Sequence, residues 1–301
     1  MFSKLTDTTK AAIFSVLVLC MSVGAALLIR FLELPQGPLM WTLWSFTPTV
    51  AALIMLLVVT REGYTREGWK SLGLHRLGLS VWWIAFGLTL LISVAASAVV
   101  WATPLASFVV PEDGIVDPII QFLIFVGIYT VWFALGEEIG MRGYLQPHLM
   151  SLGRTRALLL VGLVWATWHM PLFFLAPAIG LLKGNLLLFF PLFYGTVVAA
   201  SFIYGYLRIY TGSTWPASIA HSVHNAAWSI LGAFTLITAA SPVLVSVYLV
   251  GDFGILILIG AVVMAVWLRH YLRVGMDEAQ EAGAGVSGVE PAHPSAPAAP
   301  R

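Results

Sequence analysis

The stretch AAIFSVLVLCMSVGAALLI, residues 11–29, carries no charged side chain. Its length approaches the roughly 20 apolar residues that an α-helix needs to cross a bilayer. No A-x-A-like cleavage site follows it and more runs of the same kind come after, so we expect a retained helix rather than a signal peptide. Cys20, the single cysteine, lies in this run without a partner for a disulfide or a thiolate metal site. We interpret Cys20 as a small buried hydrophobic residue.

Similar apolar runs recur along the chain. Of its 301 residues, 59% are hydrophobic and 10% are charged, whereas soluble domains carry roughly 25% charged residues. So few charges cannot cover a soluble core, and we therefore predict an all-α polytopic membrane protein, a bundle of about eight transmembrane helices. The candidate spans are Ala11–Ile29, Leu39–Val59, Val81–Trp101, Ile119–Leu135, Ala157–Leu175, Leu186–Leu207, Trp215–Phe234 and Val247–Leu268.

The basic residues are distributed unevenly over the loops. With the N-terminus inside, all Lys and Arg residues except Arg30 and Lys183 fall in cytoplasmic segments. The positive-inside rule therefore predicts that both termini lie in the cytoplasm. The net charge of +1 indicates no partner, and without a basic stripe that alternates with aromatic residues we expect no nucleic acid.

We expect residues 1–274 to form a single transmembrane helical domain. From Gly275 the chain is rich in Ala, Gly, Pro and Glu without an apolar period, a composition typical of disorder. Residues 275–301 are therefore predicted to be a disordered cytoplasmic tail. The polar loop Arg61–Leu79 is long enough for a short surface helix.

Ionisable groups at membrane depth are costly and usually face a cavity or one another. The first group is EEIGMRGYLQ, residues 137–146. Glu138 and Arg142 are four residues apart and share a helix face, while Glu137 points roughly 100° away. The pattern indicates a structural ion pair beside a chemically available carboxylate, or simply a salt bridge at the end of a helix.

Two further groups follow on later spans. WATWHMP, residues 165–171, places His169 one turn after Trp165, and WPASIAHSVHNAA, residues 215–227, contains His221, His224 and Asn225. His221 and Asn225 share a helix face, with His224 close to it. Packing and polar contacts between helices are the structural alternatives.

Together these groups supply what is needed to attack a peptide carbonyl with water. A glutamate can accept a proton from water, and imidazole and amide groups can donate hydrogen bonds to the developing oxyanion. Glu137, His169 and His221 can instead hold a divalent metal such as zinc, although the H-E-x-x-H motif is absent from the sequence. The residues leave both mechanisms open.

The order E-E-x-x-x-R, aromatic-x-x-x-H and H-x-x-x-N, one motif per span, resembles the CAAX prenyl protease type II family, also called the CPBP or Abi family of intramembrane proteases. RGYLQ, WHMPLF and GSTWPASIAH around the motifs fit as well. The resemblance covers about residues 130–232, and the protease core is expected at about 118–235.

The resemblance implies an eight-helix bundle with an intramembrane catalytic cavity open to the cytoplasm and the lipid. In it Glu137 is the general base, His169 its partner on the water, and His221 and Asn225 the oxyanion site. Glu138 and Arg142 support the helix end, and His224 lies outside the family pattern. Both a metalloprotease and a metal-free mechanism have been argued for the family, so the expected cofactor is zinc or none.

The short loops suggest a bacterial plasma membrane protein, with a membrane-proximal peptide or protein as partner, either CAAX-type or bacteriocin-type. Two other function classes remain open. A catalytically silent immunity or scaffold protein would keep the fold without cleavage. A proton-coupled transporter would also carry buried Glu and His residues, but it predicts internal repeats and broken helices in matching halves.

Overall fold

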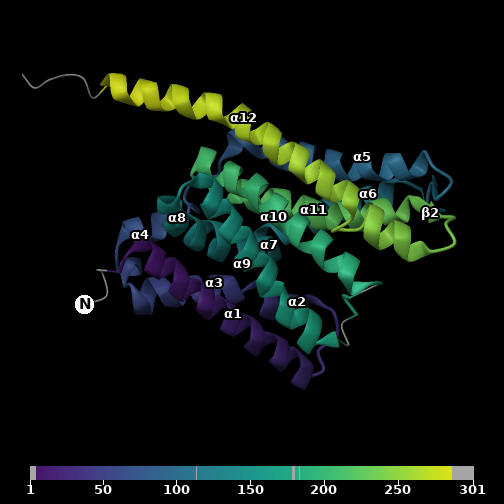
Figure 1. The fold of residues 1–301 in the computed structure, drawn as a ribbon, viewed down its shortest axis with the longest axis horizontal. Helices are drawn as coiled ribbons and strands as arrows, with labels where there is room; N and C mark the ends of the chain where they lie inside the picture. Colours follow the sequence, from purple (N-terminus) through teal and green to yellow (C-terminus); the bar gives the residue numbers. More distant parts are fainter. Residues whose placement is uncertain (1–4, 113, 178–179, 183, 287–301) are drawn as a thin grey trace, which may run out of the picture.

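The computed structural model describes residues 5–112, 114–177, 180–182 and 184–286. It is a helical bundle with one small two-stranded sheet (Figure 1). The α-helices are α1 (Asp7–Phe31), α2 (Pro38–Ser45), α3 (Thr47–Ile54), α4 (Arg66–Ser71), α5 (Thr89–Trp101), α6 (Val116–Val131), α7 (Phe133–Glu138), α8 (Gln146–Leu149), α9 (Arg154–Leu175), α10 (Leu186–Thr211), α11 (Trp215–Ala233) and α12 (Ile255–Val286). Short 3-10 turns are η3 (Glu62–Tyr64), η4 (Leu79–Val81) and η7 (Met150–Leu152), and π-helical segments are η2 (Met55–Val59), η5 (Ile84–Leu88), η6 (Ile139–Leu145) and η9 (Leu244–Leu249).

Seven segments of the described residues are long and apolar enough to cross a membrane. They agree with seven of the predicted spans, and the protein is an integral membrane protein of the all-α class. Helix α11 crosses the bundle as well, because it begins after the end of α10 and leads at its other end into β2 (Figure 1). It is less apolar because it carries the histidines and Asn225. The predicted surface helix in the loop Arg61–Leu79 is α4.

Three of the spans predicted as single helices are interrupted, namely the second, the fourth and the last. The second divides into α2 and α3 at Phe46, just before Pro48. The fourth breaks at Trp132, whose φ of −121° and ψ of −81° are not helical. Both breaks lie in the first half of the chain, and a third break interrupts the predicted last span.

The last membrane-spanning helix begins and ends later in the chain than predicted. Val247–Leu268 was expected to be one helix, but the chain forms η9, leaves helical geometry near Gly251 and Gly254, and begins α12 at Ile255. Helix α12 continues to Val286, past the expected end of the domain at residue 274. Residues 276–282 are rich in Ala, Glu and Gln, which favour helix. The rest of the predicted tail lies outside the described residues.

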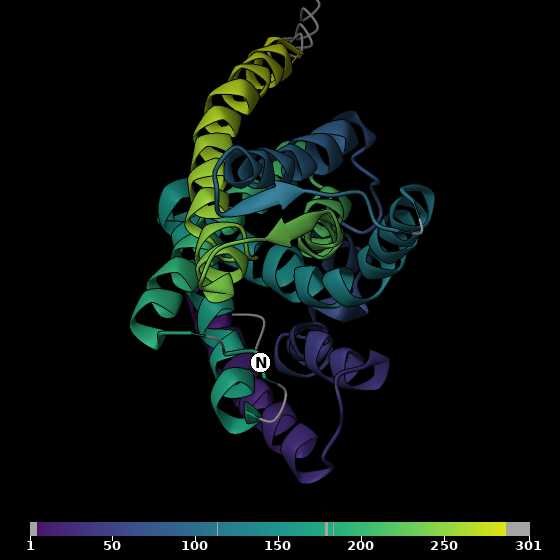
Figure 2. The ribbon, with the colours of Figure 1, turned by 90° about the vertical axis from the view of Figure 1, so that its right-hand side faces the viewer.

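A small sheet closes one end of the bundle. Strand β1 (Ala106–Phe108) pairs antiparallel with β2 (Thr235–Ile237), with Ala106 opposite Ile237. The sheet joins the segment after α5 to the segment after α11, as Figure 2 shows. We call this end of the bundle, with the α1–α2 and α9–α10 connections, the sheet end.

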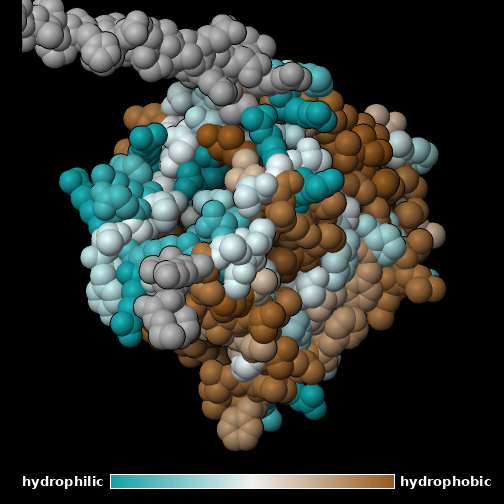
Figure 3. Space-filling model, turned by 60° about the vertical axis from the view of Figure 1, so that its left-hand side comes forward, coloured by the Kyte–Doolittle hydropathy of each residue, from teal (hydrophilic) through white to brown (hydrophobic). Residues whose placement is uncertain are grey.

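The opposite end, at the left of Figure 1, holds the start of α1, α4, and the α8–α9 and α10–α11 connections. We call it the basic end. Lys10 binds Glu62 at 2.5 Å, Arg208 donates to the Ser71 carbonyl at 2.7 Å, and Thr214 donates to the Leu72 carbonyl at 2.7 Å. These bonds hold its connections together. Figure 3 turns this end towards the viewer, and hydrophilic residues gather on one side of that face while hydrophobic residues cover most of the rest.

Among the helices, α10 packs between α9 and α12, α11 packs on α6, and α1 packs on α9. The prediction that Cys20 is buried was wrong, because its side chain is exposed on the outside of α1. An exposed apolar residue on an outer helix is the expected arrangement where lipid replaces water as the solvent.

Candidate active site

The two glutamates lie on α7, which is held close to α2 and α3. A Cβ added to Gly136 would come within 2.9 Å of the Ser45 carbonyl oxygen, and one added to Gly140 within 2.5 Å of Pro48. Thr49 also donates a hydrogen bond to the Gly136 carbonyl at 2.5 Å. Glycine at these positions lets the two backbones approach closely. Because Glu137 and Glu138 lie between Gly136 and Gly140 in the chain, this close approach fixes the position of both glutamates.

Glu138 is the centre of a buried ionic cluster. Its carboxylate binds Arg142 Nη1 at 3.1 Å, and both side chains are fully buried. It also accepts a hydrogen bond from Nδ1 of His221 at 3.0 Å, across from α11. The four-residue spacing predicted the first contact. The second joins residues 83 positions apart, which local sequence cannot indicate.

Arg142 completes the cluster by stacking on two aromatic rings. Its guanidinium carbon lies 4.3 Å from the centroid of Trp165 and 5.1 Å from that of Tyr204. Cation–π contacts of this kind stabilise a cation away from water. Trp165 belongs to a predicted motif in which it had no assigned contact, and Tyr204 is not among the predicted site residues. The cluster therefore draws on α7, η6, α9, α10 and α11.

Glu137 takes part in a different contact. Its Oε2 accepts a hydrogen bond from Nε1 of Trp165 at 2.9 Å. Neighbouring glutamates thus point to different partners, as the helical geometry predicted. Glu137 is buried in the protein but lies on the wall of a cavity. It is the carboxylate that remains available to a molecule in that cavity.

The ring orientations of both histidines follow from their Nδ1 contacts. His169 Nδ1 lies 2.9 Å from the carbonyl oxygen of Trp165, and His221 Nδ1 lies 3.0 Å from the Glu138 carboxylate. Each partner can only accept, so Nδ1 carries the proton in both rings. The Nε2 atom of each ring is then left to accept from, or when protonated to donate to, a group in the cavity.

The cavity itself has a volume of about 620 Å³. Glu137, His169, His221 and Asn225 all lie on its wall, although they come from three separate helices. His224 lines it as well. Aromatic side chains form much of the remaining wall, among them Trp41, Phe125, Tyr129, Trp165 and Trp228. The space and its apolar lining suit a peptide segment with a few polar groups placed for chemistry.

Asp252 is a site residue that the sequence analysis missed. Asp252 falls inside the predicted last span, whereas the break before α12 places it on the cavity wall. There the backbone of Asp252 contacts the His224 side chain. Its Oδ1 atom is buried and has no hydrogen-bond partner among the described residues. The glycines in Gly-Asp-Phe-Gly, residues 251–254, were the available signal of a break.

A metal site was one interpretation of Glu137, His169 and His221. Among the described residues, no three His, Cys, Asp or Glu side chains lie close enough together to hold one ion. The three proposed ligands line the same cavity without converging on a common point, so they do not fit a metal in this conformation. No step of the chemistry is therefore routed through one.

The exposed part of the cavity wall lies at one end of the bundle. Gln36, Pro38 and Gly180 are exposed residues of the cavity wall, and they lie in or next to the connections of the sheet end. If the termini are inside, this end faces outward. The predicted orientation, with both termini inside and the site facing the cytoplasm, stays a prediction.

Fold and site together define a polytopic membrane protein with a buried carboxylate, two imidazoles and an amide around one cavity. Residues 119–227 match the family described as Type II CAAX prenyl endopeptidase Rce1-like. The matched region begins within α6 and ends within α11, so it contains all three motifs. It bears out the family resemblance and supports a peptidase. No curated protein matches the chain.

Proposed function

We propose that this protein is an intramembrane endopeptidase that hydrolyses a peptide bond in a membrane-proximal peptide or protein. The observation that carries the proposal is the division of labour between Glu137 and Glu138. Glu138 is bound to Arg142 and His221, while Glu137 has one hydrogen bond, from Trp165, and lines the cavity. A carboxylate without a cationic partner is suited to accept a proton.

In the proposed reaction, Glu137 removes a proton from a water molecule as the water oxygen bonds to the scissile carbonyl carbon. His169 Nε2 accepts a hydrogen bond from the other O–H group of the water and so orients the attack. His221, when protonated, donates from Nε2 to the oxyanion together with the Asn225 amide. The Glu138 carboxylate at Nδ1 stabilises that protonated form. The proton on Glu137 then passes to the amine nitrogen as the C–N bond breaks.

The proposal can be tested with purified protein in detergent. A farnesylated CAAX peptide and an unmodified peptide with an apolar anchor would be offered in ¹⁸O-labelled water. We expect at least one to be cleaved, with one ¹⁸O atom in the new carboxylate detected by mass spectrometry. The peptide that is cleaved also decides between a CAAX-type and another substrate.

Asn225→Ala tests the oxyanion site separately, because it removes an amide from the cavity wall without altering Glu137. We expect it to slow cleavage on the order of 10²-fold, the usual loss when one oxyanion donor is removed. A folded wild-type protein that cleaves neither peptide, nor any membrane protein in native vesicles, would favour the silent scaffold protein instead.

A further inference from the structure

The cavity opening and the basic residues lie at opposite ends of the bundle. The exposed wall residues Gln36, Pro38 and Gly180 belong to the sheet end. No residue of the connections at the basic end, residues 60–78, 150–153 and 212–214, contributes to the cavity wall. The cavity therefore opens towards one end of the molecule.

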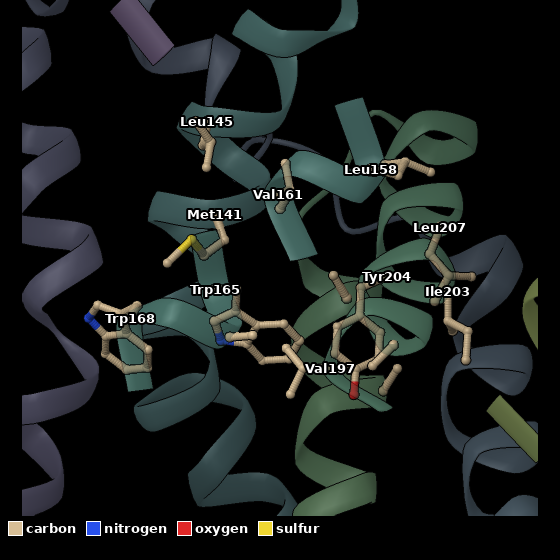
Figure 4. Close-up of a cluster of buried hydrophobic side chains, with 14 of the residues drawn as sticks. Met141, Leu145, Leu158, Val161, Trp165, Trp168, Val197, Ile203, Tyr204 and Leu207 are labelled. Carbon is tan, nitrogen blue, oxygen red and sulfur yellow. The ribbon is translucent and has the colours of Figure 1, made fainter. Parts of the chain in front are cut away.

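The floor of the cavity is closed towards the basic end. Trp165 and Tyr204 are buried wall residues, and the buried Arg142 lies against both rings. Beyond them lies a cluster of buried apolar side chains from η6, α9 and α10, including Met141, Leu145, Leu158, Val161 and Leu207 (Figure 4). In this conformation a peptide cannot reach Glu137 through such a layer, because protein interiors are close-packed.

The charges of the two ends determine how the bundle is oriented. The basic end carries exposed Arg61, Arg66 and Lys70, with Arg154 and Arg156 on the α8–α9 side. The sheet end carries exposed Glu33, Glu112 and Asp117 among its described residues, with Arg30 as the described basic residue. Such a bias in short loops places the basic end in the cytoplasm.

We propose that the active-site cavity opens on the extracytoplasmic side of the membrane. Building on the proposed function, the substrate is then a peptide that reaches this side, namely an exported peptide or the outer juxtamembrane segment of an anchored protein. Exposed Phe125 and Trp228 on the cavity wall extend its apolar surface to the side of the bundle. They suit a substrate that keeps an apolar anchor in the outer half of the bilayer.

Cysteine labelling in intact cells tests this orientation without requiring activity. In a Cys20→Ala background, Pro38→Cys places a thiol at the opening, and Arg66→Cys places one at the basic end. A membrane-impermeant maleimide should consume the Pro38→Cys thiol in intact cells. It should consume the Arg66→Cys thiol only after the membrane is permeabilised.

A second pair on one helix tests whether the opening leads to the site. Ala200 lies on the cavity wall, and Leu207 lies two turns further along α10 within the apolar layer. A small impermeant thiosulfonate should modify Ala200→Cys from outside and leave Leu207→Cys unmodified. Failure to modify Ala200→Cys from outside while Pro38→Cys reacts would overturn the claim of a continuous path.

The reverse labelling pattern, or equal labelling of both ends in intact cells, would overturn the orientation. Because labelling needs no catalysis, Glu137→Gln should label like its parent. An orientation result is thus separable from a failure of the peptidase proposal, which the ¹⁸O experiment addresses.

Discussion

Two adjacent glutamates have different surroundings at the site. Glu138 is fully buried between the Arg142 guanidinium and the Nδ1–H group of His221. Glu137 meets the indole N–H of Trp165 and the cavity. The difference arises from helical phase, because consecutive residues point about 100° apart. Substituting each glutamate separately should therefore have different consequences.

Glu137→Gln should remove activity without unfolding the protein. Glutamine keeps the size of the side chain and can still accept the Trp165 hydrogen bond, but it cannot take a proton from water. We expect turnover to fall by at least roughly 100-fold, within the usual contribution of general-base catalysis. Cleavage rates beside a melting curve in detergent would measure both effects. Near-normal turnover would remove Glu137 from the proposed reaction.

Glu138→Gln should instead lower stability along with activity. It leaves the buried Arg142 guanidinium without its carboxylate, and breaking a buried pair costs about 3–5 kcal/mol. The His221 Nδ1 contact would also lose its charged acceptor. Thermal unfolding and expression yield would report the loss. Unchanged stability would show that the cluster does not hold the helices.

Asp252 lies just before α12, and burial raises its pKa to about 7, an effect that His221 opposes. Folded protein therefore holds this proton more tightly than unfolded protein does. The resulting contribution to stability is full below the ordinary pKa of 3.8, and it declines as the pH rises towards about 7.

Asp252→Asn removes this titration. Relative to the parent, we expect the variant to gain stability between acidic and mildly alkaline conditions, because the buried charge no longer forms. Melting temperatures of both proteins in detergent at about pH 4.5 and about pH 8 would show it, because the contribution of the Asp252 proton is lost between these values. Parallel pH profiles for parent and variant would contradict the assignment.

At the scale of elements, the site depends on how closely α7 and η6 approach α3. The π-helical segment η6 follows Glu138 directly, and Arg142 within it still reaches the glutamate. Irregular turns of this kind often occur at functional sites. Gly140 faces Pro48 with no room for a side chain, so the contact holds the glutamates in place.

Gly140→Ala should separate these elements. The added Cβ would lie 2.5 Å from Pro48 backbone and side-chain atoms, and overpacking typically costs about 1–3 kcal/mol. We expect a lower melting temperature and reduced turnover. Gly127→Ala on α6 is the control, because a Cβ there has no atom within 4 Å. Alanine favours helix over glycine, so the control should be neutral or more stable. Equal effects in both would contradict the contact argument.

At the scale of the whole molecule, three helices must bring Glu137, His169 and His221 together before a metal could bind. They share a cavity wall, but no metal-binding group of three forms among the described side chains. We therefore expect cleavage to survive thorough chelation. Activity before and after chelator treatment, with metal content by mass spectrometry, would measure this. Loss of activity that zinc restores would establish a metal-dependent mechanism.

The sequence by itself determined the class of the protein and most of its spans. Apolar runs such as Ala11–Ile29 can adopt few structures in a membrane, because every backbone polar group in hydrocarbon must be hydrogen-bonded within a helix or a closed barrel. The spacing of Glu138 and Arg142 likewise determined a contact, since residues four apart are neighbours on any helix.

Only the tertiary structure decided the contacts between segments and the direction in which the cavity opens. The bond from His221 to Glu138, the stacking of Arg142 on Trp165 and Tyr204, and the place of Asp252 join distant positions. Local patterns do not encode such pairs, because they arise when whole helices pack. The cavity opens where the ends of the helices diverge, and it is closed where Trp165, Tyr204 and the apolar layer fill the space between the helices. The position of the opening is therefore a property of the packed bundle rather than of any single span.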